Sequence, residues 1–95
     1  MEPRYTIFSN RESGFGRYDV ILEPKGNDDA IILEFKVFDP DEENTLTDTV
    51  HKALEQIEQK KYETGLLSKG FAGNRIRKYG FAFRGKTVLI GDGTI

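Results

Sequence analysis

The chain contains no cysteine, a single histidine and no run of apolar residues long enough to cross a bilayer. Without cysteine, a disulfide framework, a thiolate zinc site and a cysteine nucleophile are excluded. Because His51 has no second histidine at ligand spacing, neither a zinc site nor a histidine-dependent triad is expected. The opening segment, residues 1–4, lacks the apolar stretch of a signal peptide. We therefore expect a cytoplasmic protein with no membrane partner.

Length and composition predict one small folded unit. The chain has 95 residues, of which 37% are hydrophobic and 12% aromatic. This composition supplies enough apolar side chains for one core and argues against disorder. A unit of this size buries only about 60 to 65% of its unfolded surface. We expect a single domain over residues 1–95.

Charge is divided unevenly along the chain. Residues 1–44 hold eleven acidic and five basic residues, a net charge of −6, whereas residues 45–95 hold five acidic and nine basic residues, a net charge of +4. A basic surface beside an acidic site suits a polyanion, since cations hold phosphates while carboxylates hold metal. An ordinary mixture of solvated surface charges is the alternative interpretation.

Two apolar runs, residues 17–23 and 30–37, are predicted to form a β-hairpin because turn-forming residues separate them. A turn centred between positions 26 and 27 pairs positions whose numbers sum to 53. In that register Asp19 lies opposite Glu34, beside an apolar pair formed by Ile21 and Ile32. The other face pairs only aromatic and aliphatic residues. These pairs are Tyr18 with Phe35, Val20 with Leu33, and Leu22 with Ile31.

Directly opposite carboxylates repel each other unless a cation lies between them, so Asp19 and Glu34 predict a metal site. Carboxylate oxygens suit Mg²⁺ or Mn²⁺, and the backbone carbonyl of Phe35 could supply a further oxygen. Lys36 follows about 7 Å along the strand from Glu34 and could orient or deprotonate an attacking water. The alternative is a strand edge facing solvent with a structural salt bridge.

A short strand, a loop and a helix surround this hairpin in the prediction. The strand covers residues 5–9, and the acidic loop over residues 39–43 ends the second hairpin strand because its proline cannot continue a ladder. Apolar residues at helical spacing then predict a helix that Thr45 or Thr47 caps and Gly65 ends. These residues are Leu46, Val50, Ala53, Leu54 and Ile57.

Strands over residues 75–84 and 87–90 complete the predicted fold, and residues 91–94 are expected to fray. A helix between two strands normally makes a right-handed parallel connection, so the first of these strands should run parallel to a strand of the meander. The expected fold is α/β: a mixed sheet with a three-stranded meander, a crossover helix and further strands. Aromatic residues alternate along residues 75–84, which indicates core positions, with base stacking as the alternative. They are Tyr79, Phe81 and Phe83.

These elements carry a resemblance to a known family. The segments on which the resemblance rests are Gly14-Phe15-Gly16-Arg17-Tyr18-Asp19, Glu34-Phe35-Lys36, a helix with Gln56 and Tyr62, and Tyr79-Gly80-Phe81-Ala82-Phe83. From about residue 8 to residue 90, the chain resembles the PD-(D/E)XK nuclease superfamily. More narrowly, it resembles the nuclease-like domain that follows an AAA-ATPase-like domain in many bacterial proteins.

The resemblance implies a restriction-endonuclease-like fold and a set of site residues. It implies Asp19 and Glu34 as metal ligands, Lys36 as the catalytic lysine, and Gln56 as an accessory residue near the scissile phosphate. Tyr62 is a further accessory candidate. An exposed helix glutamine is the alternative interpretation of Gln56.

One departure from the family pattern concerns the N-terminal helix, which often carries a glutamate that completes the metal site. This helix is expected to be missing, because the chain starts too late to contain it. Glu12 is the nearby substitute, and an exposed loop acid is its alternative interpretation.

The predicted function is Mg²⁺-dependent hydrolysis of nucleic acid, DNA rather than RNA. The alternative is a catalytically silent nuclease-like module that binds nucleic acid or a protein partner of an ATPase, and a purely structural domain is a third possibility. The oligomeric state stays open, a dimer included. Several basic residues are candidate phosphate contacts, although surface cations also serve solubility alone. They are Arg17, Lys60, Lys61, Arg75, Arg77 and Lys78.

Overall fold

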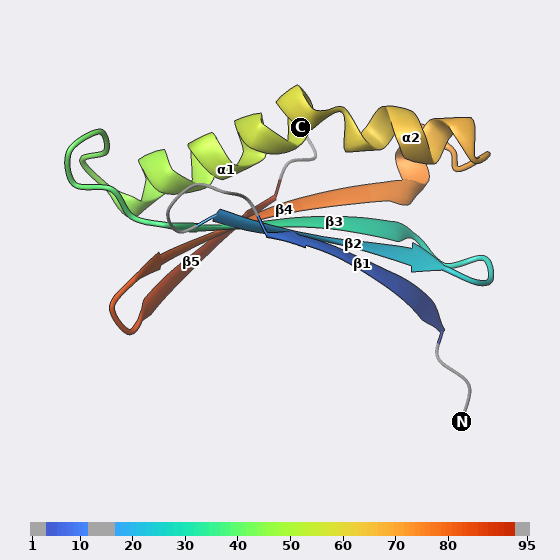
Figure 1. Ribbon diagram of the computed structural model, residues 1–95, viewed down its shortest axis with the longest axis horizontal. Helices are drawn as coiled ribbons and strands as arrows, with labels where there is room; N and C mark the ends of the chain where they lie inside the picture. Colours follow the sequence, from blue (N-terminus) through green and yellow to red (C-terminus); the bar gives the residue numbers. More distant parts are fainter. Residues whose placement is uncertain (1–3, 12–16, 93–95) are drawn as a thin grey trace.

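Five strands form one mixed sheet in the computed structural model, which describes residues 4–11 and 17–92 (Figure 1). The strands are β1 (Tyr5–Arg11), β2 (Arg17–Pro24), β3 (Ala30–Val37), β4 (Ile76–Arg84) and β5 (Thr87–Asp92). Their order across the sheet follows the chain. Neighbouring strands are antiparallel except β3 and β4, which run parallel. The predicted meander and the parallel crossover connection are confirmed.

The β2–β3 hairpin has the register that the sequence predicts. Asp19 lies opposite Glu34, and Ile21 lies opposite Ile32. Side chains alternate along β3 between buried positions and positions that are half-buried or exposed. The apolar pattern and the turn together therefore suffice to fix the pairing, because a slip of one residue would reverse the faces of every side chain.

The crossover consists of two helices, α1 (Leu46–Lys60) and α2 (Tyr62–Ser68). Thr45 is the N-cap of α1, since its hydroxyl accepts a hydrogen bond from the Asp48 N–H and the Asp48 carboxylate accepts one from the Thr45 N–H. This reciprocal capping box selects Thr45 over Thr47. Within the described residues, no helix is long and apolar enough to cross a membrane.

The helix ends earlier than predicted, and the expected stop at Gly65 is wrong. Lys61 adopts a left-handed backbone conformation with φ of 57° and ends α1, while Gly65 lies inside α2. Few residues other than glycine adopt this conformation, so the sequence carries no signal for the break. The break redirects the chain between the two helices.

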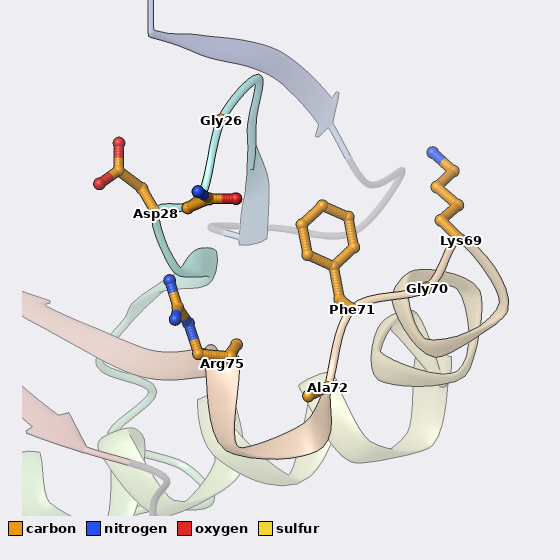
Figure 2. A pocket seen from close by; sticks show the side chains of 8 residues that line it. Gly26, Asp28, Lys69, Gly70, Phe71, Ala72 and Arg75 are labelled. Carbon is orange, nitrogen blue, oxygen red and sulfur yellow. The ribbon is translucent and has the colours of Figure 1, made fainter.

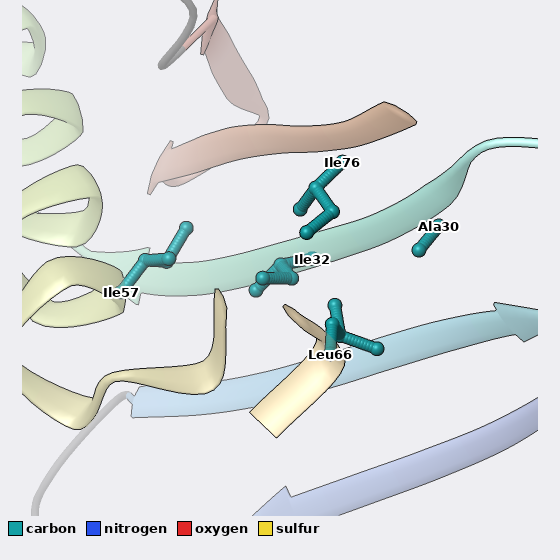
Figure 3. Packing of buried hydrophobic residues seen from close by; sticks show 5 residues of the cluster. All are labelled: Ala30, Ile32, Ile57, Leu66 and Ile76. Atoms are coloured by element: carbon teal, nitrogen blue, oxygen red, sulfur yellow. The ribbon is translucent and has the colours of Figure 1, made fainter. Parts of the chain in front are cut away.

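A small apolar core lies between the helices and the sheet (Figure 3). Ile32 of β3 and Ile76 of β4 pack with Ile57 of α1 and Leu66 of α2, and Ala30 completes the cluster. Both helices lie on the same side of the sheet (Figure 1). One sheet face is therefore covered, and the buried carboxylates described below lie on that face.

The aromatic residues of β4 lie on the opposite sheet face, which corrects their predicted place in the core. Gly80 and Ala82 are buried and face the helices, so Tyr79, Phe81 and Phe83 point to the other side. These three side chains are half-buried. Phe35 contacts two of the rings, with centroids 4.9 Å from Phe81 and 6.0 Å from Phe83. Phe35, Phe81 and Phe83 therefore form an aromatic cluster on the sheet face that the helices do not cover.

The last strands differ from the prediction at their ends. A short 3-10 turn (Gly73–Arg75) precedes β4, which begins one residue later than expected. Gly91 and Asp92 do not fray, because they belong to β5 and pair with Gly80 and Tyr79 of β4. The remainder of the predicted tail, residues 93–94, lies outside the described residues.

Close packing of α1 on β4 predicts that Gly80→Ala destabilises the protein by about 1–3 kcal/mol. An added Cβ would lie 3.1 Å from the Val50 carbonyl oxygen and 3.2 Å from the Ala53 Cβ. Gly65→Ala is the matched control, because nothing lies within 4 Å of its Cβ position and it should stabilise α2 by up to about 1 kcal/mol. Urea denaturation measures both, and an unchanged midpoint for Gly80→Ala would contradict the close packing.

Candidate active site

The site is built on two buried carboxylates from adjacent strands. Asp19 of β2 is 0% exposed and Glu34 of β3 is 1% exposed. They are direct cross-strand partners, so their side chains leave the same face of the sheet. Burying a carboxylate is costly unless a cation or hydrogen-bond donors compensate its charge. The surroundings of the pair must therefore supply positive charge.

Lys60 and Tyr62 supply donors to this pair from the junction of the two helices. The Lys60 ammonium and the Tyr62 hydroxyl each lie 2.8 Å from Asp19 Oδ2. The same ammonium lies 3.9 Å from Glu34 Oε1. In a continuous helix, residues two positions apart point to different sides. The left-handed Lys61 between them allows both side chains to reach Asp19.

The two oxygens of Asp19 have unequal surroundings. Oδ2 accepts two hydrogen bonds, whereas Oδ1 is buried and has no hydrogen-bond partner among the described residues. Buried polar atoms in native proteins usually have a partner, so such an exception calls for an explanation. A ligand that binds oxygen at this position would provide one.

Lys36 lies on the same face as Glu34 and is held by a second buried acid, Glu43. The Lys36 ammonium lies 2.6 Å from Glu43 Oε2. Lys36 is 7% exposed and Glu43 is 3% exposed. Their short, buried contact is a charge-assisted hydrogen bond, which is stronger than a neutral one. The predicted catalytic lysine therefore has a defined position within the fold.

Several donors hold Glu43 in its ionised form. Its Oε1 accepts hydrogen bonds from the Asp39 N–H at 2.9 Å and from the Thr49 hydroxyl at 2.7 Å. Burial alone would raise the pKa of Glu43, but the hydrogen bonds from Lys36, Asp39 and Thr49 outweigh burial and lower the pKa to about 2. Glu43 is therefore charged at neutral pH and balances Lys36.

Gln56 is half-buried and lies one helical turn before Lys60 on α1. Residues four positions apart share one side of a helix, so Gln56 and Lys60 lie on the same side of α1. Its placement agrees with the predicted border between the buried and solvated sides of the helix.

Besides Lys60, three of the cations predicted to contact nucleic acid are engaged in ion pairs. Arg75 and Arg77 both contact the carboxylate of Asp29, just before β3. Lys78 contacts one carboxylate on each helix, at 2.7 Å on α1 and 2.8 Å on α2. Asp29 precedes Glu34 by five positions, or about 16 Å along an extended chain. The two arginines are therefore not gathered around the carboxylate pair.

The other candidates fall into two groups. Lys60 is at the site itself, in contact with Asp19, and Lys61 next to it is exposed. Glu12 lies outside the described residues, and so does the side chain of Arg17.

The surface of the described residues includes a hollow beside the segment that follows α2 and another beside α2 itself. One, of about 520 Å³, lies between the β2–β3 turn and the segment after α2, and its lining includes Asp28, Lys69, Phe71 and Arg75 (Figure 2). None of the predicted catalytic side chains lines it. A smaller hollow, of about 330 Å³, is bordered by Tyr62, whose hydroxyl binds Asp19. Tyr62 thus connects the smaller hollow with Asp19, although neither Asp19 nor Glu34 lines the hollow.

Comparison with protein families agrees with this geometry. A family model for the PD-(D/E)XK nuclease superfamily matches residues 1–93. The chain belongs to this superfamily. Comparisons with curated proteins and with solved structures found no significant match. The mixed five-stranded sheet, with a helix after its third strand, is the restriction-endonuclease-like α/β fold. The sequence resemblance and the fold class are confirmed.

PD-(D/E)XK nucleases generally use divalent metal ions, and two features of this chain fit such an ion. Asp19 Oδ1 is buried without a hydrogen-bond partner among the described residues, and Glu34 lies directly opposite Asp19, so both carboxylates leave the same face of the sheet. The described residues contain no cluster of three or more acidic, histidine or cysteine side chains that could hold a metal. Two carboxylates are enough for Mg²⁺, which keeps several waters.

The sequence does not single out Glu43, and it does not reveal the contact between Lys60 and Asp19. Glu43 stands in a run of acids, residues 41–43, and nothing in that run marks which acid turns inward. The sequence predicts Lys60 as a phosphate contact. Lys60 follows Gln56 by four positions, so both residues lie on one side of a helix. That spacing is the signal that could have connected Lys60 with the site.

Proposed function

We propose that this chain is a nuclease that hydrolyses DNA phosphodiester bonds with Mg²⁺ or Mn²⁺ as its cofactor. The observation that carries the proposal is the buried pair of Asp19 and Glu34, which lie opposite each other on two neighbouring strands. Two buried carboxylates at one place favour a cation strongly. In a superfamily of nucleases, such a pair is best explained as a metal site.

Asp19 and Glu34 would hold the ion through their carboxylates, and the Phe35 carbonyl would add a third oxygen. When bound, such an ion polarises the phosphate and lowers the pKa of a bound water. The Tyr62 hydroxyl orients Asp19 by donating to Oδ2, which leaves Oδ1 for the ion. Glu12 would add a third carboxylate.

Lys36 would act on the phosphate or on the attacking water. It follows Glu34 by two positions, so its side chain leaves β3 on the same face as the carboxylates. Glu43 keeps the ammonium in place through a 2.6 Å contact. A positioned cation stabilises the negative charge that develops at phosphorus in the transition state. Gln56 would assist near the scissile phosphate.

The charge distribution supports a nucleic acid as the partner, and DNA is the one that we propose. The second half of the chain carries a net charge of +4, and the exposed Lys61 lies beside the site. This charge includes Lys60, Arg75, Arg77 and Lys78, which would bind phosphates by exchanging their internal ion pairs for them. An AAA-ATPase-like domain as neighbour and a cytoplasmic location stay predictions from the sequence.

The ion dependence of cleavage tests this proposal. Mg²⁺ or Mn²⁺ should support slow cleavage of plasmid DNA, while Ca²⁺ should bind without supporting it, because Ca²⁺ tolerates looser geometry and acidifies water less. Chelator should abolish the reaction. Cleavage that continues at full rate in chelator would contradict a metal-dependent mechanism.

The second candidate function is a catalytically silent module that binds nucleic acid or a protein partner of an ATPase. One observation favours it: the charged side chains of the site already pair with each other. Lys60 forms an ion pair with Asp19, and Lys36 forms one with Glu43. In that case DNA binding without cleavage should fall steeply with salt concentration. Binding isotherms at several salt concentrations, measured with a cleavage assay on the same samples, separate the two functions.

A further inference from the structure

The Lys60 ammonium occupies the region that a bridging cation would need. It lies 2.8 Å from Asp19 Oδ2 and 3.9 Å from Glu34 Oε1, so a single positive charge serves both buried carboxylates. The Lys60 side chain is 19% exposed, whereas the two acids are almost fully buried. Lys60 therefore closes the solvent side of the pair.

A divalent ion and this ammonium compete for the same negative charge. Two cations within a few ångströms of each other repel strongly in the low dielectric of a protein interior. Asp19 Oδ1 is buried and has no hydrogen-bond partner among the described residues, so the carboxylate has an oxygen to offer a stronger cation. The ammonium compensates the charge of the pair but leaves this oxygen unused.

The position of Lys60 in the fold allows it to leave the site. It is the last residue of α1, and the left-handed Lys61 follows it. Its long, partly exposed side chain can move its ammonium to solvent without displacing the helix. Tyr62 can keep its hydrogen bond to Asp19 Oδ2 during this movement, since the hydroxyl carries no charge.

We propose that Lys60 is the internal cation of the metal-free site and that a divalent ion must displace it from Asp19 to bind. This inference rests on the proposed metal-dependent function. Lys60 thereby stabilises the fold when metal is absent and weakens the affinity of the site for metal. It is a positioning residue in this role, not a phosphate contact of the metal-free protein.

Isothermal titration of the whole chain with Mn²⁺ tests the inference without any activity assay. Lys60→Met should bind Mn²⁺ at least about tenfold more tightly than the wild type, a difference of about 1.4 kcal/mol. Lys61→Met is the matched control, because it removes the same charge from the neighbouring exposed position and should change the affinity much less. In chelator, Lys60→Met should melt at a lower temperature than the wild type, and Mn²⁺ should raise its melting temperature by more.

Each outcome has a distinct meaning. Equal or weaker Mn²⁺ binding by Lys60→Met, with clear binding by the wild type, overturns the role of Lys60 and leaves the proposed function intact. Absence of Mn²⁺ binding from both proteins overturns the metal site itself. If Lys60→Met does not fold in chelator, Lys60→Gln replaces it, because the amide still donates to Asp19 but carries no charge. The same tighter binding is expected for this variant, and unchanged binding overturns the inference.

Discussion

Replacing Lys36 with alanine is expected to lower the rate of Mn²⁺-dependent DNA cleavage by about 100- to 1,000-fold while leaving Mn²⁺ binding intact. In the proposed site carboxylates would hold the ion, so its affinity should not depend on this lysine. The developing charge at phosphorus does depend on a fixed cation, and Lys36 is fixed by its 2.6 Å contact with Glu43. Cleavage kinetics and isothermal titration on the same preparation measure both quantities.

The Lys36→Ala variant also removes the ammonium that pairs with the buried Glu43 carboxylate, so a control must separate this effect from the loss of Lys36 itself. The double variant Lys36→Met with Glu43→Gln removes both charges together and should fold but remain inactive. Lys25→Ala changes an exposed lysine in the β2–β3 turn and should cleave like the wild type. Full activity of the double variant would show that Lys36 takes no part in the chemistry.

Replacing Glu43 with glutamine is expected to destabilise the protein by about 2–4 kcal/mol at pH 7, because the buried Lys36 ammonium loses its anionic partner. Glu43 also accepts hydrogen bonds from Asp39 and Thr49, and glutamine can keep only part of this set. Glu42→Gln is the matched control, since the Glu42 side chain is 68% exposed. Urea denaturation should show little change for this neighbour.

The same variant predicts a pH dependence with a definite sign. The pKa of Glu43 is about 2 in the folded protein against an ordinary value of 4.5. Its ionised form therefore contributes about 3 kcal/mol of stability above pH 4.5, and this contribution is lost as the pH falls toward 2. The stability difference between wild type and Glu43→Gln should shrink over this interval. A difference that stays constant from pH 7 to pH 2 would show that the Glu43 charge is not stabilised by folding.

The hairpin and its carboxylate pair could be predicted from the sequence because local and tertiary signals agree there. Turn formers fix the loop, and apolar residues fix which side of each strand is buried. Together they place Asp19 opposite Glu34, as the structure shows. The parallel connection followed from chain topology alone.

The neighbours of the pair could not be predicted, because they depend on a backbone conformation and on long-range contacts. Lys61 is not a glycine, so nothing in the sequence marks its left-handed conformation. The apolar spacing instead predicts a helix that continues to Gly65. That break turns Lys60 and Tyr62 toward Asp19, 41 and 43 positions earlier in the chain. The contact between Lys36 and Glu43 likewise requires the acidic loop to fold back over the sheet.

The most direct test of a metal-dependent nuclease site at Asp19 and Glu34 is cleavage of plasmid DNA in Mn²⁺. Wild type, Asp19→Ala and Glu34→Ala should be purified in parallel and assayed side by side. The expected result is cleavage by the wild type alone, with loss of both cleavage and Mn²⁺ binding in each variant. Equal cleavage by all three proteins would contradict the site and indicate a contaminating nuclease, and an inert wild type that binds DNA would identify a silent module.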